Sequence, residues 1–477
     1  MTKTLAPSED FLQSLKQLVG PSGWQHPDDA ARYLDDPRGY VRGKAALIVL
    51  PSNVEEVSEI IKLCAKSRIG IVPYGGGTGL VSGQVVPEND HAIILSLERM
   101  NTTRSIDPDN DSMVVEAGCI LTDVQNAAQD ANRLFPLSLA SEGSCRIGGN
   151  LATNAGGIQV IRYGNARDLC LGIEAVLPDG TIYNGLSPLR KDNTGYDLRH
   201  LLIGSEGTLG IITAASLKLF PRPQSSSTAF CALPSPSHAI SLLNFCREAM
   251  GDTVSAFELM CSEGMDVLAQ HFPKERHPFN GEYSWFALIE IAGSPGIEEK
   301  FETVLMEAFE NELLLDSVIA SSSAQSRALW RLRELMADAN KLGGVFCSSD
   351  TSVPKNRVDD FIKMTDAAIL ELNPDLIINK YGHMGDGNLH FNVFPPKGIG
   401  KDEFMEANPT TQEDVRRIIN DMTHKLHGSI SGEHGIGRLK TADLQRYGDP
   451  VKIAVMKSIK MGLDPDNIMN PGAIFSN

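Results

Sequence analysis

The sequence predicts an α+β protein whose first half mixes strands and helices and whose second half carries an antiparallel sheet. An apolar run from Ala45 to Leu50, a helical pattern at 54–67 and an apolar run from Ile69 form a strand–helix–strand order. After Pro223, longer helical patterns alternate with extended apolar runs. We therefore expect a first domain over 1–222 with its core at 45–222, a second domain over 223–425, and a helical C-terminal segment over 426–477.

The elements of the first domain follow from periodicity and turn residues. An amphipathic helix is expected at 8–19, ended by Gly20 and Pro21. In the helix at 54–67, one face collects Val57, Ile60, Ile61 and Cys64. Further strands are expected at AIILSL, SMVVEAG, LGIEAVLPDG and GIITAASLKLF, with a helix near 122–133.

In the second half, extended runs and helices alternate. Strands are expected at STAFCAL, YSWFALIEIAG and LIINKYGH. Helical patterns occupy 238–250, 297–310, 324–340, 355–371, 411–427 and 449–460.

Composition limits the classes of function. With 43 Lys and Arg against 60 Asp and Glu, the net charge of −17 argues against sequence-independent nucleic-acid binding but allows an anionic small substrate. Eight cysteines without a CxxC pair indicate reduced thiols. No apolar run approaches the roughly 20 residues that span a bilayer, and the start of the chain is acidic where a signal peptide is apolar. We therefore expect a cytoplasmic protein without a transmembrane segment, with peripheral membrane contact left open.

A glycine loop follows the predicted strand at Ile69. Gly75, Gly76, Gly77 and Gly79 surround Thr78, and backbone N–H groups in such a turn can cradle a pyrophosphate. The spacing is neither GxGxxG nor GxxxxGK, so a tight structural turn is the alternative. Two further stretches, at 141–157 and 203–213, are dense in Gly, Ser, Thr and Asn and would let backbone lie against a large planar ligand.

The motifs VPYGGGTGL, GGNLATNAGG, YGNARDLCLGIEAVLPDG and LLIGSEGTLGIIT together resemble the FAD-binding domain of the vanillyl-alcohol oxidase type of flavoprotein. The resemblance implies an FAD held by Pro73, Tyr74, Gly75, Gly76, Gly77, Thr78, Gly79, Leu80, Ser141, Gly143, Gly148, Asn150, Thr153, Asn154, Gly156, Glu206, Gly207 and Ile211. Covalent members attach the flavin to His or Cys. The loop at 72–83 has neither, so we expect non-covalent FAD, with Cys145 as another conceivable attachment point.

The stretch YGHMGDGNLHFNV predicts a hairpin with Asp386 and Gly387 as a two-residue turn. In that register His383 lies directly opposite His390, close enough for both imidazoles to share one divalent ion, and Asn392 points the same way. In GSISGEHGIG, Glu433 is the candidate carboxylate ligand and His434 the candidate base. A polar hairpin held by hydrogen bonds is the alternative.

These two motifs, with the tail PDNIMNPG, resemble the C-terminal domain of FAD-linked D-2-hydroxy-acid dehydrogenases, a group that includes D-lactate dehydrogenases, the glycolate oxidase catalytic subunit and D-2-hydroxyglutarate dehydrogenase. The resemblance implies a divalent ion, often zinc, on His383, His390 and Glu433. It makes His434 the general base and a substrate contact, adds Asn392 as a second contact, and returns Asn470 to the flavin.

The WRLRE segment resembles the part of the family whose arginine grips the substrate carboxylate, which makes Arg333 the clamp. A surface ion pair of Arg333 with a neighbouring Glu is the alternative. One position departs from the family pattern, because Ser348 stands where many relatives carry lysine.

The resemblance implies oxidation of a D-2-hydroxy acid to the 2-oxo acid by hydride transfer to flavin N5, with D-2-hydroxyglutarate favoured and D-lactate next. It also implies a separate electron acceptor (an electron-transferring flavoprotein, a quinone or a cytochrome) and leaves a homodimer open. Two alternatives remain: a non-redox flavoprotein of the same fold, like alkyl-dihydroxyacetone-phosphate synthases, and a non-catalytic subunit of a glycolate-oxidase-like complex.

Overall fold

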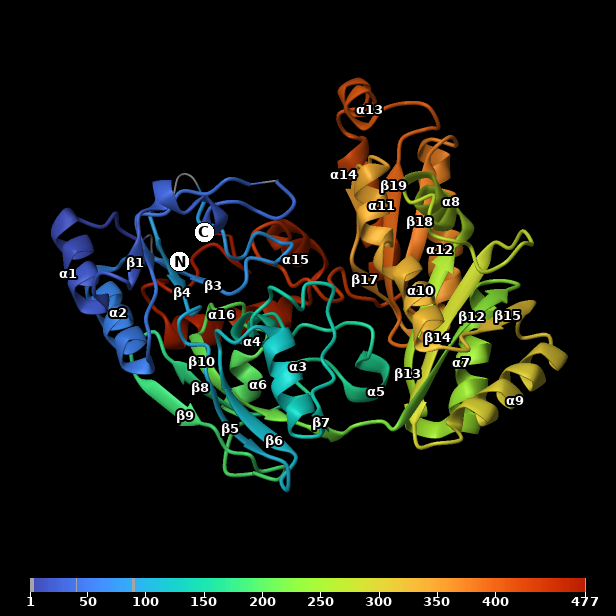
Figure 1. Ribbon diagram of the computed structural model, residues 1–477. Helices are drawn as coiled ribbons and strands as arrows, with labels where there is room; N and C mark the ends of the chain where they lie inside the picture. The colour runs from blue at the N-terminus through green and yellow to red at the C-terminus, as the bar shows by residue number, and fades with distance from the viewer. Residues whose placement is uncertain (1–3, 40, 88–90, 477) are drawn as a thin grey trace. The chain divides into compact units, whose positions relative to one another are not determined.

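The computed structural model describes residues 4–39, 41–87 and 91–476 (Figure 1), so the outermost residues of the predicted domain ranges, 1–3 and 477, lie outside the described part. The chain forms two units, each with its own sheets and helices, as the α+β prediction requires. Unit 1 comprises Met1–Gly156, Gly164–Arg222 and Glu433–Asn477, and unit 2 comprises Gly157–Tyr163 and Pro223–Gly432.

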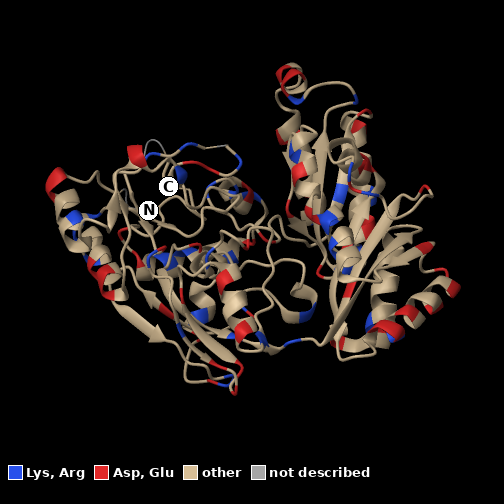
Figure 2. Cartoon of the chain, viewed as in Figure 1, with Lys and Arg blue, Asp and Glu red and all other residues tan. Residues whose placement is uncertain are grey.

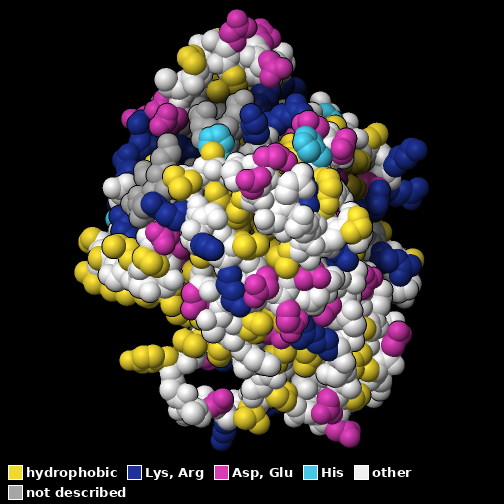
Figure 3. All heavy atoms as spheres, turned by 90° about the vertical axis from the view of Figure 1, so that its left-hand side faces the viewer, with side chains coloured by type: hydrophobic (Ala, Val, Ile, Leu, Met, Phe, Trp, Pro, Cys, Tyr) yellow, Lys and Arg dark blue, Asp and Glu magenta, His cyan; other side chains and the backbone are white. Residues whose placement is uncertain are grey.

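Positions of Lys and Arg and positions of Asp and Glu both occur along the helices of the two units (Figure 2). The face turned to the viewer in Figure 3 likewise interleaves acidic, basic and hydrophobic side chains. Within the described residues, no helix is long and apolar enough to cross a membrane.

Unit 1 begins with a four-stranded sheet in the order β1-β2-β4-β3, in which β2, β4 and β3 run parallel and β1 is antiparallel. The helix α2 connects β2 to β3, which confirms the predicted strand–helix–strand order. The bounds are α1 Glu9–Val19, β1 Trp24–Gln25, β2 Ile48–Val49, α2 Val54–Ser67, β3 Ile71–Tyr74 and β4 Ile93–Ser96.

Residues within and just before α2 determine where the helix begins and which of its faces is buried. Asn53 Oδ1 accepts the Glu56 N–H at 2.8 Å, and Glu56 in turn accepts the Ser52 N–H at 2.7 Å, which is a reciprocal N-terminal cap. The predicted apolar face is buried in full: Val57, Ile60, Ile61 and Cys64.

A second sheet in unit 1 is antiparallel, with five strands in the order β5-β6-β10-β8-β9. Its strands are β5 Thr103–Asp107, β6 Ser112–Glu116, β8 Cys170–Val176, β9 Ile182–Gly185 and β10 Ile211–Lys218. A two-stranded pair joins β7 Arg133–Leu134 to β11 Phe220–Pro221. The helices are α3 Leu121–Asp130, α4 Ile147–Ala152 and α6 Leu198–Leu202.

The C-terminal helices α15 (Thr441–Tyr447) and α16 (Pro450–Leu463) belong to unit 1, and the tail after them joins its first sheet. Met469 forms a parallel bridge with Ile71 of β3. The buried Lys460 ammonium, paired with Asp464, donates to the carbonyl oxygens of Thr208 and Met469, each at 2.8 Å. This lysine therefore fixes the returning tail beside the third glycine-rich stretch.

Unit 2 is built on one eight-stranded sheet, whose path is β15-β12-β14-β13-β18-β19-β16, with β17 also paired to β19. All its pairings are antiparallel, as predicted. The strands are β12 Ser225–Leu233, β13 Val254–Cys261, β14 Trp285–Gly293, β15 Asp316–Ile319, β16 Cys347–Ser348, β17 Thr351–Ser352, β18 Ile377–His383 and β19 Asn388–Phe394.

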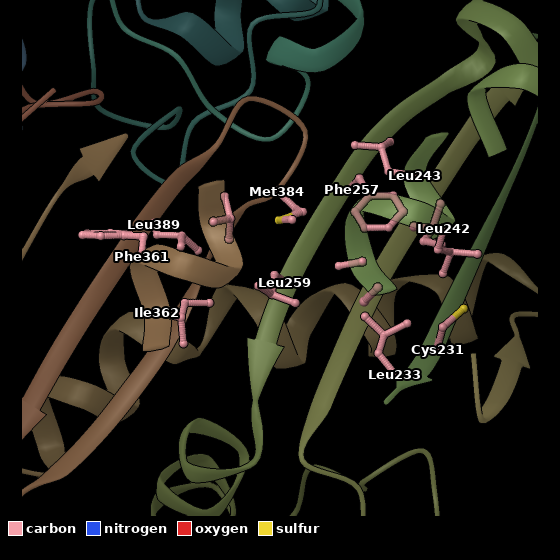
Figure 4. Close-up of a cluster of buried hydrophobic side chains, with 14 of the residues drawn as sticks. Cys231, Leu233, Leu242, Leu243, Phe257, Leu259, Phe361, Ile362, Met384 and Leu389 are labelled. Carbon is pink, nitrogen blue, oxygen red and sulfur yellow. The ribbon is translucent and has the colours of Figure 1, made fainter. Parts of the chain in front are cut away.

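Hydrophobic clusters cover both faces of this sheet. On one face, Leu242 and Leu243 of α7 lie beside Phe257 and Leu259 of β13 (Figure 4). The other face packs against α8, α10 and α11. The helices of unit 2 are α5 Val160–Tyr163, α7 Pro236–Met250, α8 Ser262–His271, α9 Ile297–Glu310, α10 Ser323–Glu334, α11 Met336–Leu342, α12 Val358–Leu372, α13 Lys401–Ala407 and α14 Thr411–Lys425.

Two predictions about unit 2 need correction. The helical pattern at 324–340 forms two helices, α10 and α11, that meet at Leu335. Strand β13 was missed, because every residue from Val254 to Cys261 is buried and no polar–apolar alternation marks it.

Candidate active site

The structure brings the first two predicted glycine-rich stretches into contact within unit 1. A Cβ atom on Gly76 would lie 2.1 Å from the Ser144 carbonyl oxygen, and one on Gly75 would lie 3.3 Å from Gly149 Cα. Only a residue without a side chain fits at Gly76, since its backbone packs directly on the neighbouring loop. The glycines at this turn therefore serve close packing of two backbone segments.

The third stretch joins the same cluster through its backbone. The Gly204 N–H donates to the Leu151 carbonyl at 2.9 Å, and the Glu206 N–H donates to the Ala152 carbonyl at 2.8 Å. A Cβ on Gly207 would lie 2.3 Å from the Pro73 ring. All three stretches that the sequence singled out thus meet in one place.

The loop after β3 offers a row of hydrogen-bond donors. Among the described residues, none accepts a hydrogen bond from the backbone N–H groups of 76–80, and these residues are only partly buried. Backbone N–H groups in folded proteins are nearly always paired, so consecutive unpaired ones favour an anionic ligand or water. Gly77, with φ of 75°, bends the row into a turn. The loop fits the pyrophosphate of FAD.

The tail and the third stretch are held together by Glu206. Its carboxylate accepts the N–H groups of Ile436 and Gly437, each at 2.7 Å, and its carbonyl accepts the Asn470 side-chain amide at 2.7 Å. Burial raises the pKa of the Glu206 carboxyl above its ordinary value, and the two backbone N–H donors oppose that rise. Arg438 in turn donates to Asn470 Oδ1 at 2.8 Å.

Several other predicted cofactor residues shape the second stretch by local bonds. Thr153 Oγ1 donates to the Gly149 carbonyl, Asn154 Oδ1 accepts the Arg167 N–H, and the Asn150 amide lies 3.6 Å from Cys145 Sγ. Ile211 differs from these, because its side chain lies in the hydrophobic core of unit 1. Burial raises the pKa of the Cys145 thiol, which disfavours the thiolate that attachment to a flavin requires.

Replacing Gly76 by alanine tests the close packing at this loop. We expect the free energy of unfolding to fall by about 1–3 kcal/mol, the usual cost of forcing atoms into a packed interior, with weaker FAD retention. The measurement is thermal unfolding followed by flavin fluorescence. Gly462→Ala in α16 is the control, since a Cβ there meets nothing within 4 Å and alanine is tolerated in a helix, so the free energy of unfolding should not fall. Equal stability of both variants would contradict this packing argument.

In unit 2, the predicted hairpin exists but its register is different. His383 pairs with Asn388 and Tyr381 pairs with His390, so the two histidines are diagonal neighbours and not directly opposed. The turn has four residues, 384–387, instead of the two predicted. Because the register differs by an even number of residues, both histidines still point to one side of the sheet.

Each hairpin histidine uses Nδ1 within unit 2. His383 Nδ1 lies 2.7 Å from Glu258 Oε1, and His390 Nδ1 lies 3.2 Å from the Ser349 carbonyl oxygen. An acceptor at Nδ1 places the proton there and assigns metal coordination to Nε2, as is usual for metal-ligating histidines. The ring centroids are 6.0 Å apart.

Glu433 directly follows Gly432, whose N–H donates to the Asp350 carbonyl at 3.3 Å, so the local chain path leads it to the hairpin. Ligand atoms of His383, His390 and Glu433 all lie within 4.8 Å of one another. A second group with the same spacing shares Glu433 and adds Asp350 and His434. Two imidazoles and a carboxylate suit a zinc ion that keeps open positions. The residues therefore fit a divalent ion.

Arg333, the predicted carboxylate clamp, reaches the same face of the sheet from α10. Its Nε donates to Glu258 Oε2 at 2.7 Å, and its guanidinium carbon lies 4.6 Å from the centre of the Tyr381 ring. Burial alone raises the pKa of the Glu258 carboxyl, but His383 and Arg333 hold it below its ordinary value. This buried pair with the distant Glu258 differs from the surface ion pair with a neighbouring Glu that the sequence left as an alternative.

Asn392 lies on the same side of β19 as His390, and directly opposite Ser348 on β16. Its side-chain amide lies 3.4 Å from the His390 carbonyl oxygen. Sequence reasoning missed three groups of this face: Glu258, Tyr381 and the Ser349 carbonyl. Glu258 lies in the strand that was not predicted. Every residue has a backbone carbonyl, so no residue type in the sequence could indicate the role of the Ser349 carbonyl.

Comparisons with known proteins show which family the chain belongs to. Residues 222–474 match the family model described as "FAD linked oxidases, C-terminal domain", and residues 45–185 match "FAD binding domain". The two matches and the relatives below identify an FAD-dependent oxidoreductase that acts on a CH–OH donor. More specifically, the chain belongs to the family of FAD-linked D-2-hydroxy-acid dehydrogenases, as its motifs predicted.

Three relatives show the extent of the match. The mitochondrial D-2-hydroxyglutarate dehydrogenase of Arabidopsis thaliana is 37% identical over 91% of this chain and 77% of its own length. That of Rattus norvegicus is 37% identical over 90% of this chain and 78% of its own length. The D-2-hydroxyglutarate dehydrogenase of Xanthomonas citri pv. viticola is 36% identical over 90% of this chain and 89% of its own length.

Solved structures confirm the fold. p-Cresol methylhydroxylase with substrate bound aligns with a TM-score of 0.75 at 17% identity, over 100% of this chain and 99% of its own. Alkyldihydroxyacetonephosphate synthase aligns with a TM-score of 0.73 at 19% identity, over 99% of this chain and 86% of its own. These likenesses support the vanillyl-alcohol oxidase type of fold and nothing finer.

The prediction of a cytoplasmic protein is wrong by this comparison. Relatives from Arabidopsis thaliana, Oryza sativa, Rattus norvegicus and Schizosaccharomyces pombe carry mitochondrial in their names. All eight cysteines are buried and free, which fits a reducing environment. Free thiols indicate that environment but do not say which compartment supplies it, and this is where the prediction failed.

Proposed function

We propose that this enzyme oxidises a D-2-hydroxy acid to the 2-oxo acid with non-covalent FAD and a divalent ion, zinc being the first candidate. D-2-hydroxyglutarate is the first substrate candidate, since relatives at 36–37% identity carry that name. D-lactate is the second, supported by a relative named putative D-lactate dehydrogenase. The observation that carries the proposal is the His383–His390–Glu433 donor set, with each imidazole anchored through Nδ1.

The two units divide the task in this proposal. Unit 1 binds FAD through the donors of the loop at 76–80, and unit 2 binds the substrate. When bound, a divalent ion on His383, His390 and Glu433 would supply Lewis-acid polarisation of the substrate hydroxyl, and FAD would supply the acceptor for the C2 hydride. Reoxidation of FAD then needs an acceptor such as an electron-transferring flavoprotein, a quinone or a cytochrome.

The side chains have distinct roles. We assign the carboxylate clamp to Arg333, because a planar guanidinium suits two parallel hydrogen bonds to a carboxylate. His434 removes the hydroxyl proton, a task for a group that titrates near neutral pH. Asn392 offers its amide to the substrate from the same side of β19 as His390. Because the family lysine position holds Ser348, a second cationic contact is absent there.

Anaerobic mixing with a panel of acids tests this proposal. The purified protein is combined with D- and L-2-hydroxyglutarate, D- and L-lactate, and glycolate, and flavin absorbance is followed. We expect bleaching by a D-acid and formation of its 2-oxo acid in equal amount. Bound FAD that no acid in the panel bleaches would contradict the proposal and favour non-redox chemistry.

A further inference from the structure

A buried glutamate that the mechanism above does not use joins two of its parts. Glu258 of β13 has no exposed side-chain surface. Its Oε1 lies 2.7 Å from His383 Nδ1, and its Oε2 accepts the Arg333 Nε–H at 2.7 Å. All three residues belong to unit 2. We propose that Glu258 is a positioning residue that couples the ion ligand His383 to the carboxylate clamp Arg333, an inference that rests on the proposed function.

The carboxylate form is what the arrangement requires. His383 donates from Nδ1 and Arg333 donates from Nε, so each oxygen of the Glu258 side chain accepts one hydrogen bond. Neutral imidazole with its proton on Nδ1 presents a lone pair on Nε2, which is the coordinating form. Glu258 therefore selects the histidine tautomer that can bind an ion.

The same contacts fix the distance between two substrate-binding groups. A 2-hydroxy acid carries its hydroxyl on the carbon next to the carboxylate. The protein groups that bind the hydroxyl and the carboxylate must therefore lie at a fixed distance from each other. Because one carboxylate binds both His383 and Arg333, it restrains the two side chains relative to each other. Tyr381 supports this spacing, since its ring lies 4.6 Å from the Arg333 guanidinium carbon and 5.3 Å from the His390 ring.

Glutamine at this position would break the coupling although its shape is nearly the same. Glutamine has one acceptor oxygen and one NH2 group. If the NH2 faced His383, the imidazole would accept at Nδ1 and carry its proton on Nε2, where it blocks coordination. If the NH2 faced Arg333, two donors would oppose each other. Either orientation weakens ion binding or the clamp.

Unit 2 offers a matched control in Glu290. This glutamate on β14 is partly buried, and its carboxylate accepts hydrogen bonds from the Ser255 hydroxyl at 2.8 Å and from the Trp330 indole N–H at 3.0 Å. Glu290→Gln therefore replaces a partly buried carboxylate of the same sheet whose hydrogen-bond donors named here are neither His383 nor Arg333.

The experiment compares Glu258→Gln, Glu258→Asp and Glu290→Gln with the wild-type enzyme. Zinc affinity is measured by competition with a chromophoric chelator, and kcat and KM are measured with D-2-hydroxyglutarate. Loss of an outer-sphere partner usually lowers metal affinity about 10–100-fold, so we expect that drop in Glu258→Gln, with KM at least about tenfold higher. Glu258→Asp, which keeps the charge, should recover part of both values, and Glu290→Gln should match wild type.

Two outcomes distinguish failure of the proposed role of Glu258 from failure of the proposed metal site. If His390→Ala loses zinc while Glu258→Gln keeps wild-type affinity and KM, the role of Glu258 is overturned and the metal site stands. If wild type and His390→Ala bind zinc equally poorly, the metal site itself fails, and the inference with it. Should Glu258→Gln not fold, Glu258→Asp decides, because wild-type values in that variant would also overturn the coupling.

Discussion

Replacing His434 by alanine is expected to lower the rate constant for flavin reduction by D-2-hydroxyglutarate about 10²–10⁴-fold, the usual contribution of a general base. The imidazole is the group proposed to take the hydroxyl proton, and alanine cannot replace it in that role. Anaerobic stopped-flow absorbance measures the rate constant directly.

FAD should stay bound in this variant, because backbone contacts hold the segment around His434. The Ile436 and Gly437 N–H groups bind the Glu206 carboxylate, and neither bond involves the His434 side chain. The control is His271→Ala at the end of α8, which should reduce at the wild-type rate. Reduction of the His434 variant at the wild-type rate would remove this residue from the mechanism.

Replacing Arg333 by lysine is expected to raise KM for D-2-hydroxy acids about 10–150-fold, which corresponds to the 1.5–3 kcal/mol of a hydrogen bond to a charged group. Lysine keeps the positive charge beside the buried Glu258 but loses the two-pronged fork that a carboxylate accepts. Removing the charge altogether would leave Glu258 buried and without its arginine partner, and the loss of stability would obscure the effect. Steady-state kinetics with each acid provide the measurement.

The same helix supplies the control for this change. Arg331 pairs with Glu275 at 2.6 Å, but its side chain is 56% exposed. Arg331→Lys should therefore leave KM unchanged, since exposed ion pairs contribute little. If both variants show the same KM, or if Arg333→Lys lowers kcat alone, Arg333 does not bind the substrate carboxylate.

How far the sequence could predict the structure depends on whether the deciding interactions are local. Helix α2 was predicted to the residue, because its cap at Asn53 and its 3.6-residue apolar spacing lie within the segment itself. The three glycine-rich stretches were also recognised, but their mutual packing was not, since the contact of Gly76 with Ser144 joins distant parts of the chain.

The hairpin register shows the opposite case. The Asp386–Gly387 pair is a strong local signal for a two-residue turn. In the structure Gly387 accepts the Val353 N–H through its carbonyl, and a Cβ on Gly387 would lie 2.1 Å from the Val353 oxygen. The segment around Val353 therefore helps to determine the conformation of the turn, and this tertiary contact overrides the local preference for two residues.

Glu258 could not be found from local pattern at all. It is a charged residue in the middle of a fully buried strand, and its partners come from α10 and β18, far away in the sequence. Buried charges are rare unless they are paired, so such a residue becomes informative only when its partners are known.

The central claim is that FAD reduction depends on a divalent ion held by the His383–His390–Glu433 set. The direct test is the rate constant for anaerobic flavin reduction by a saturating D-2-hydroxy acid, before chelation, after chelation, and after zinc is restored. We expect chelation to lower the rate constant at least about 10²-fold, as loss of Lewis-acid stabilisation requires, and zinc to restore it. An unchanged rate constant in protein that elemental analysis finds free of metal would contradict the account.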